Sequence, residues 1–125
     1  HLPGFFIKGV SIIRAIPKKL LIHTVIYARE EESDRWGTVS LMHKQEVRYV
    51  RMETSGKIIR DKTNAEIQLA ATLFYDCKNS RPKGVTFHVD DIIFFQNEKY
   101  KVQLVEPLYD GECLHHYELG VIKYA

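Results

Sequence analysis

The alternation of hydrophobic and polar positions along the chain is typical of β-strands, and it is clearest between residues 89 and 105. Residues 92–95 form an unbroken apolar run. Successive strand residues point to opposite faces, so this run predicts a strand that is buried on both sides. A short polar turn at residues 96–98 follows, and polar and apolar residues then alternate strictly from 99 to 104. The stretch therefore predicts a hairpin with one central arm and one half-buried arm.

Further strands are expected on both sides of this hairpin. In chain order, the pattern predicts strands over residues 18–29, 36–41, 46–54, 57–60 and 114–124. The acidic run at residues 30–34 is expected to be a solvated loop, and Pro107 is expected to end the second arm of the hairpin. Because the run at residues 92–95 has no polar face, we expect Phe94, together with Ile93 or Phe95, to be among the most buried side chains.

Residues 65–77 fit two different structures. Ile67, Ala70 and Phe74 have the spacing of one helix face, whereas the apolar positions from Ile67 to Tyr75 also alternate as in a strand. The strand-rich neighbours favour the strand and leave the helix as an alternative. The whole pattern predicts an all-β fold: a small, barrel-like antiparallel domain of about six to eight strands with little helix.

Length and composition limit the class of protein. A chain of 125 residues predicts a single domain over residues 1–125, with residues 1–16 as an extended N-terminal arm. The formal charge of +2, from 18 basic and 16 acidic residues, is not the dense positive charge of a dedicated nucleic-acid-binding protein. No apolar run reaches the roughly 18 residues that a membrane helix needs, so no membrane partner is expected.

The sequence offers no recognisable catalytic or metal-binding motif. His115 and His116 are adjacent on a predicted strand, so their side chains are expected to leave opposite faces and not to share a metal. There is no H-E-x-x-H, no paired C-x-x-C, no G-x-S-x-G and no phosphate-binding glycine loop. Cys77 and Cys113 are expected to be free thiols. We therefore predict no metal, no cofactor and no enzymatic activity.

One loop has a composition that suggests binding. Residues 78–84 carry Lys78, Arg81 and Lys83 with no acidic residue between them. The functional interpretation is an electrostatic contact with phosphate or with an acidic partner, and the alternative is an ordinary solvated loop. Three charges would give a weak, salt-sensitive contact without sequence readout. The seven tyrosines would also allow base stacking in an OB-like barrel, although most of them occupy alternating strand positions, where a core or half-buried tyrosine is expected.

Several short motifs occur in an order that points to a known family. They are Ile16-Pro17-Lys18-Lys19-Leu20-Leu21, Val47-Arg48, Leu73-Phe74-Tyr75-Asp76 with Asn79-Ser80, Asp91-Ile92-Ile93-Phe94, Tyr100-Lys101-Val102 and His115-His116-Tyr117-Glu118. In this order they resemble the minor capsid proteins of tailed phages of Gram-positive bacteria. The segment from Asp91 to Val102 is also similar to the barrel of head-closure, or stopper, proteins, which form a ring between the portal and the tail.

The resemblance implies a structural function in the virion. It implies a head–tail connector subunit, made in the cytoplasm of the bacterial host, that assembles with copies of itself into a ring. Portal or adaptor proteins and tail proteins would be its neighbours, and DNA would pass through the channel without sequence-specific contact. The resemblance brings no catalytic residues.

In such a ring the basic loop would face DNA or an acidic neighbour. The apolar N-terminal residues, which are too hydrophobic for a solvated tail, would dock on another subunit: Phe5, Phe6, Ile7, Ile12 and Ile13. The main alternative function is an OB-like module that binds single-stranded nucleic acid, which exposed aromatic residues beside basic residues on one barrel face would favour. A small metal-dependent hydrolase is a further alternative, which convergent His, Cys or Asp side chains would favour.

Overall fold

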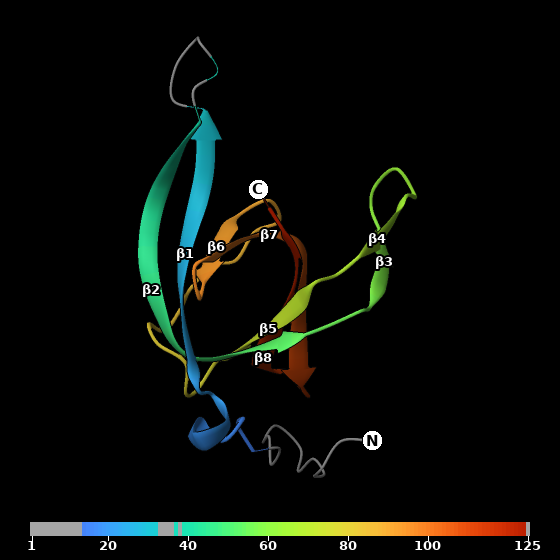
Figure 1. The fold of residues 1–125 in the computed structure, drawn as a ribbon. Coiled ribbons are helices and arrows are strands. Elements are labelled where there is room, and N and C mark those ends of the chain that lie inside the picture. The colour runs from blue at the N-terminus through green and yellow to red at the C-terminus, as the bar shows by residue number, and fades with distance from the viewer. Residues whose placement is uncertain (1–13, 33–36, 38, 125) are drawn as a thin grey trace.

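The computed structural model describes residues 14–32, 37 and 39–124, and they form an antiparallel β-structure (Figure 1). A 3-10 turn, η1 (Lys18–Leu20), precedes eight strands. In chain order the strands are β1 (His23–Glu32), β2 (Val39–Thr54), β3 (Ile58–Arg60), β4 (Glu66–Gln68), β5 (Ala71–Asp76), β6 (Ile92–Phe95), β7 (Glu98–Asp110) and β8 (Cys113–Lys123). The all-β prediction, including the number of strands, is confirmed. Within the described residues, no helix has the length and apolar character that crossing a bilayer requires.

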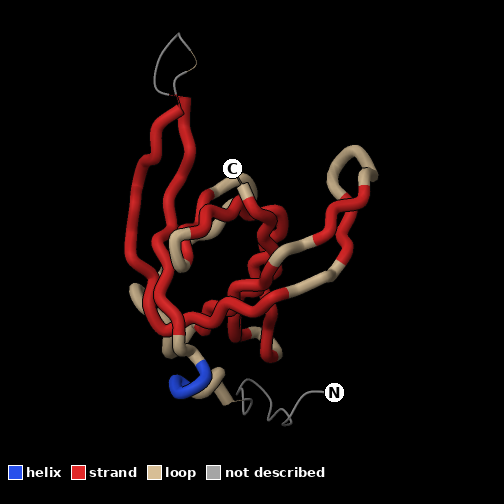
Figure 2. Tube along the Cα trace, viewed as in Figure 1, coloured by secondary structure: helices blue, strands red, loops and turns tan. Residues whose placement is uncertain are grey.

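Six of the strands close into a barrel in the order β1-β2-β5-β8-β7-β6, and every neighbouring pair is antiparallel. The barrel is closed by a short seam between β1 and β6, which consists of three residue pairs: Ile26–Phe94, Tyr27–Ile93 and Ala28–Ile92. Strands β3 and β4 form a separate hairpin that projects from the barrel (Figure 2). Closing a sheet on itself pairs strand edges that would otherwise be free.

The hydrophobic core fills the inside of the barrel, and the segment after the basic loop contributes to it. Val85 and Phe87 are both buried there. The ring of Phe87 lies 5.1 Å from Tyr27, 5.0 Å from Tyr75 and 5.3 Å from Tyr117 between centroids, each pair edge to face. This is a favourable arrangement for aromatic rings. The strands supply the aliphatic core residues, among them Val25, Val47, Val50, Leu73, Ile93, Val102, Leu119 and Val121.

The central hairpin is present, but one core prediction is wrong. Ile92 and Ile93 are fully buried, whereas Phe94 and Phe95 are only partly buried. Ile93 belongs to the core inside the barrel, so Phe94, the next strand residue, points to the outer face. Phe94 lines shallow depressions there, which explains why it is not among the most buried residues.

Several predicted strand boundaries at the N-terminal side are also corrected. Residues 18–20 form η1, because the N–H groups of Leu20 and Leu21 bond back to the carbonyls of Pro17 and Lys18. The acidic residues 30–32 continue β1 and are not a loop, since pairing with β2 satisfies their backbone while the strand projects into solvent. Residues 33–36 and 38 lie outside the described part of the chain.

Strand β2 is one long strand where the sequence predicted two, and β7 is longer than expected. Positive φ angles at His43 (56°) and Tyr49 (57°) mark irregularities within β2. Strand β7 continues through Pro107, which pairs with Tyr117 of β8. The β6 pairing on the other side of β7 has already ended at Lys101, so proline removes no hydrogen bond to β6.

Residues 65–77 form two strands, β4 and β5, so the helical alternative is wrong. Between them Leu69 is buried, with its backbone N–H bonded to the carbonyl of Lys57. Leu69 packs over β8 at Gly120, where a Cβ atom would come within 2.7 Å of a Leu69 methyl group. Leu104 contacts the same glycine position, because a register shift between Val102 and Leu104 interrupts the alternation of β7.

Candidate functional site

The basic loop at residues 78–84 is held in place by a buried carboxylate. Asp76, the last residue of β5, is fully buried. One of its oxygens accepts hydrogen bonds from the backbone N–H groups of Lys78 (3.1 Å) and Asn79 (2.8 Å), and the other accepts one from Ile16 (3.0 Å). A buried carboxylate needs such partners to remain stable. Asp76 therefore fixes the start of the loop.

Further hydrogen bonds join the same loop to β2 and β5. The backbones of Arg81 and Arg48 exchange two hydrogen bonds of 2.7 and 3.0 Å. Ser80, which is fully buried, donates its hydroxyl to the carbonyl of Tyr49. The Tyr75 hydroxyl donates to the carbonyl of Pro82 (2.6 Å). The loop is consequently a fixed part of the barrel and not a flexible appendage.

The three basic residues singled out in the sequence have different roles in this loop. Lys78 and Lys83 are exposed. Arg81 is partly buried, and its guanidinium donates to the carbonyls of Lys78 (2.7 Å) and Ser80 (2.9 Å). Arg81 thus shapes the loop in addition to supplying positive charge.

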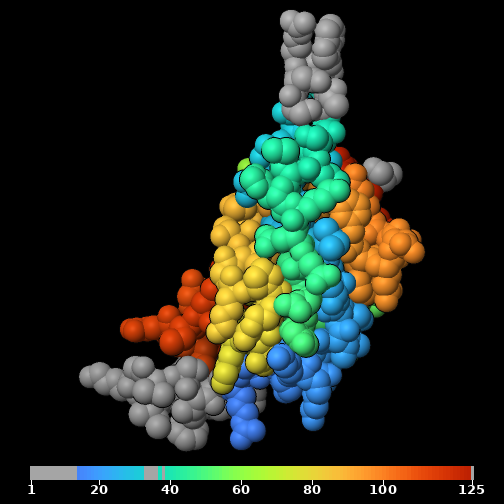
Figure 3. Space-filling model, turned by 90° about the vertical axis from the view of Figure 1, so that its left-hand side faces the viewer, coloured from blue at the N-terminus to red at the C-terminus, as the bar shows by residue number. Residues whose placement is uncertain are grey.

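The fold brings two further cations beside the loop. Arg48 comes from β2, and Lys18 comes from η1 with its Nζ atom 4.3 Å from the ring centroid of Tyr49, a cation–π contact. We call these five residues the basic surface: Lys18, Arg48, Lys78, Arg81 and Lys83. Figure 3 shows this side of the molecule, where the atoms of the loop lie beside those of β2 with η1 below them. Sequence reasoning missed Lys18, Arg48 and Tyr49, because no local pattern links three segments so far apart in the chain.

Few acidic side chains lie close enough to the basic surface to neutralise its positive charge. Glu46 lies 3.7 Å from Arg48 in an exposed ion pair, and the Asp76 carboxylate faces backbone N–H groups inside the fold. Such a surface can attract phosphate groups or an acidic protein without reading a sequence. The ring of Tyr49 already faces Lys18, so it is not a free platform for base stacking.

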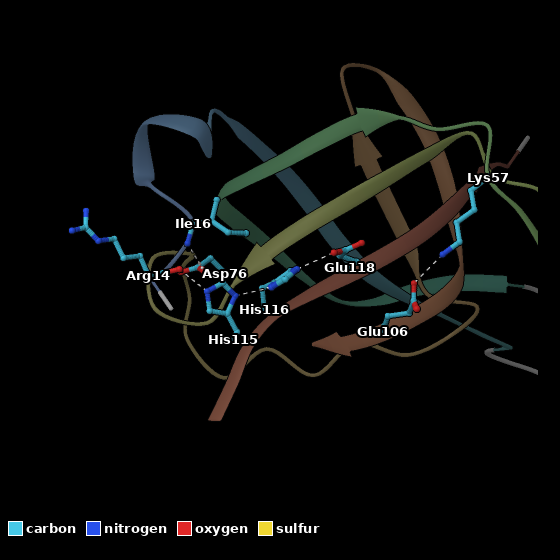
Figure 4. A network of polar contacts seen from close by, with 8 residues as sticks. All are labelled: Arg14, Ile16, Lys57, Asp76, Glu106, His115, His116 and Glu118. Carbon is cyan, nitrogen blue, oxygen red and sulfur yellow. Dashed lines mark hydrogen bonds and ion pairs between the residues drawn. The ribbon is translucent and has the colours of Figure 1, made fainter. Parts of the chain in front are cut away.

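Next to the basic surface, the N-terminal residues of the described chain are tied to the barrel (Figure 4). The carbonyl oxygen of Arg14 lies 2.7 Å from His115 Nε2. The N–H of Ile16 donates to Asp76, and the Ile16 carbonyl accepts from the Asn79 side chain (2.8 Å). The N-terminal residues expected to dock on another subunit, Phe5, Phe6, Ile7, Ile12 and Ile13, lie outside the described residues, so their docking stays a prediction.

His115 and His116 approach each other, contrary to expectation. Their Nδ1 atoms are 2.8 Å apart. The pairing of β7 with β8 shifts register between Leu108 and Tyr109, which leaves His115 as the extra residue of a bulge. A bulge disrupts the strict alternation of side chains, and it places both rings on one side of β8.

Each imidazole ring also contacts an oxygen atom outside the pair. His115 Nε2 contacts the Arg14 carbonyl, and His116 Nε2 lies 2.9 Å from the Glu118 carboxylate. Both partners are hydrogen-bond acceptors, so Nε2 is the donor atom of each ring in these two contacts. Across the described residues, no group of three or more His, Cys, Asp or Glu side chains is arranged to hold a metal ion.

The cysteine beside the site is not an activated nucleophile. Burial, and secondly the nearby Asp76, raise the pKa of the Cys77 thiol above its ordinary value. A reactive cysteine has the opposite shift. Burial likewise raises the pKa values of the Tyr75 and Tyr117 hydroxyls. The arrangement therefore suits binding through charge and shape better than acid–base or nucleophilic chemistry.

Comparison with known proteins gives one family. The sequence model of the minor capsid protein family matches residues 17–121. Among solved structures, the chain is similar to the phage-like element PBSX protein xkdH from Bacillus subtilis, with a TM-score of 0.47 and 15% sequence identity over 81% of this chain and 92% of that chain. No curated protein matches the sequence.

Proposed function

Because this chain belongs to the minor capsid protein family and is thus a structural protein of the phage particle, we propose that it is a head–tail connector subunit. It would act in a ring between the portal and the tail, with copies of itself, portal or adaptor proteins and tail proteins as neighbours. It would be made in the cytoplasm of the bacterial host and would have no enzymatic activity. The observation that carries the proposal is the basic surface, whose loop is anchored by the buried Asp76 and by backbone hydrogen bonds to Arg48.

A ring gives this surface a function that a single chain lacks. Even if all three loop cations neutralised a phosphate, the logarithm of the binding constant would fall with the logarithm of the salt concentration with a slope of only about −3. The sequence-independent affinity of one chain would therefore be weak. Repeated around one axis, the same contacts become effectively intramolecular and reinforce one another. A connector built in this way would hold DNA or an acidic neighbour only after assembly, and it would let DNA slide.

The first prediction tests the exposed lysines of the loop. Arg81 shapes the loop, so the informative variant is the double substitution Lys78→Ser with Lys83→Ser. Both side chains are exposed, so the thermal midpoint of unfolding should not change. In a phage that lacks the wild-type gene, complementation with this variant should yield heads that lose DNA or fail to join tails, scored by electron microscopy.

A matched control removes the same charge elsewhere. Lys101 contacts the ring of Tyr124 and Lys123 pairs with Glu98, both outside the basic surface, and their double replacement by serine should leave the particles normal. Normal particle yield from the Lys78/Lys83 variant would show that the loop is ordinary solvated surface. Tight, salt-sensitive binding of single-stranded DNA by the wild-type monomer, lost in Tyr49→Ala, would instead favour the nucleic-acid-binding alternative.

A further inference from the structure

The β3–β4 hairpin stands free of the barrel with an exposed apolar residue. Three residue pairs join its strands: Ile58–Gln68, Ile59–Ile67 and Arg60–Glu66. Ile58 is 58% exposed. A two-stranded hairpin is only marginally stable in water, and both of its outer edges here carry backbone groups without a strand partner among the described residues.

The turn of this hairpin is nevertheless well ordered by local hydrogen bonds. One oxygen of the Asp61 carboxylate accepts from the Thr63 N–H (2.8 Å), the Thr63 hydroxyl (2.7 Å) and the Ala65 N–H (3.0 Å). These bonds lower the pKa of Asp61, with the Thr63 hydroxyl as the main cause. The ordered turn keeps the two strands of the hairpin together, which lowers the conformational entropy that Ile58 and its neighbours would lose on binding.

An apolar groove lies on the outer face of the β1–β6 seam. It is lined by Ile26 and Phe94 together with Lys44, Gln45 and Glu46 of β2, and we call these five residues the seam groove. A second depression on the same face shares Ile26 and Phe94. Phe94 is only partly buried there although it belongs to a fully apolar run, so the groove has unused apolar surface at its floor.

The hairpin and the groove lie on opposite sides of the barrel. In Figure 1 the β3–β4 hairpin projects on the right, whereas β1, β2 and β6 form the left side. One chain therefore cannot fill its own groove with its own hairpin. Two different surfaces that meet between copies make a head-to-tail contact, and such contacts generate rings when the rotation closes.

The β1–β2 ribbon that leads away from the seam groove and the β3–β4 hairpin carry opposite net charge. Residues 29–32 and 39–46 of this ribbon contain four carboxylates and two cations. The hairpin at residues 57–68 contains three cations and two carboxylates. Complementary charge steers association and favours one register over others.

We propose that the β3–β4 hairpin of one copy docks in the seam groove of the next copy, with Ile58 against Ile26 and Phe94. The partner is thus a second copy of this chain. The inference rests on the proposed ring and names the surfaces that build it. Docking would cover the free edges of the hairpin and the exposed apolar side chains of both surfaces.

Cysteine crosslinking in assembled particles tests this contact. In a Cys113→Ser background, phage particles carry the chain with Ile58→Cys and Gln45→Cys and are treated with a short bismaleimide. Crosslinking between neighbours should give a ladder of chain multimers on a denaturing gel. The control pairs Gln45→Cys with Tyr109→Cys, because Tyr109 is also 58% exposed but lies outside both surfaces, and it should give no ladder. Particles that contain the Ile58/Gln45 variant and give no ladder would refute the docking.

A second variant removes the apolar contact without disturbing the fold. Ile58→Asp changes an exposed side chain, so the thermal midpoint should stay the same, and the chain should be at least tenfold depleted from particles relative to Tyr109→Asp. Incorporation at the wild-type level would contradict the docking. Immunogold labelling locates the wild-type chain in the particle and separates the two proposals. A crosslinking ladder with gold label away from the head–tail joint would refute the connector function alone. Gold label at the joint without a crosslinking ladder would refute the docking alone.

Discussion

At the level of single residues, His23 makes the stability of the barrel depend on pH. Its Nδ1 atom accepts the backbone N–H of Met52 (2.9 Å), and its ring packs edge to face on Phe95. Burial, and secondly the Arg51 cation, lower the pKa of His23 below its ordinary value of 6.5. Protonation would remove the acceptor at Nδ1, so the folded state favours the neutral ring.

The sign of the pH dependence follows from this shift. Above about pH 6.5 His23 is neutral in both the folded and the unfolded chain, and its contribution to stability is fully present. As the pH falls below that value, the unfolded chain binds the proton more readily and the contribution is lost. The urea midpoint should therefore fall between pH 7 and pH 5. His23→Asn retains an acceptor near the Nδ1 position without titrating, and its midpoint should fall less; an identical fall would show that other groups are responsible.

At the level of a strand, β6 separates two residues that look equivalent in the sequence. Ile93 is fully buried in the core, and Phe94 beside it lies on the outer face. Ile93→Ala should cost about 2–5 kcal/mol of unfolding free energy, because it leaves a cavity. Phe94→Ala should cost less, roughly 1–2 kcal/mol, because the partly buried ring keeps some contact with water and its removal opens an existing surface depression and leaves no closed cavity. Chemical denaturation of both variants measures the two losses of unfolding free energy. A larger loss for Phe94→Ala than for Ile93→Ala would show that Phe94 belongs to the core.

Bulges and register shifts also operate at this level. In the β1–β2 pair they occur next to His23 and between Tyr27 and Arg29. In the β7–β8 pair they occur between Val102 and Leu104 and between Leu108 and Tyr109. Each one changes which side chains share a face. The contact between His115 and His116, and the position of Leu104 beside Gly120, both depend on such shifts.

At the level of the whole molecule, stability should differ between the barrel and the hairpin. Strands β5 and β8 are paired on both sides within the barrel, whereas β3 and β4 pair only with each other among the described residues. Amides of β5 and β8 should therefore exchange with solvent slowly, through global unfolding, and those of β3 and β4 should exchange much faster. Hydrogen–deuterium exchange read by mass spectrometry measures both. Equal protection in the isolated monomer would show that the hairpin is held by contacts within the chain.

The same comparison in assembled particles addresses the proposed docking. Covering the hairpin by a neighbouring copy should slow exchange in β3 and β4 while leaving β5 and β8 unchanged. Under the proposed docking, the barrel would be the rigid body of the assembly and the hairpin its connecting element.

The sequence by itself determined the strand-rich class, the hairpin at residues 92–104, the loop at residues 78–84 and the family resemblance. Period-two alternation and turn-forming residues are local signals, so they can be recognised in the sequence without knowledge of the fold. Only the tertiary structure decided which face of a strand is covered, as Phe94 shows, and where bulges interrupt the alternation, as His115 shows. It also brought Lys18, Arg48 and the loop together around Tyr49, because contacts between residues 30 or more positions apart depend on how the strands pair and leave no local pattern.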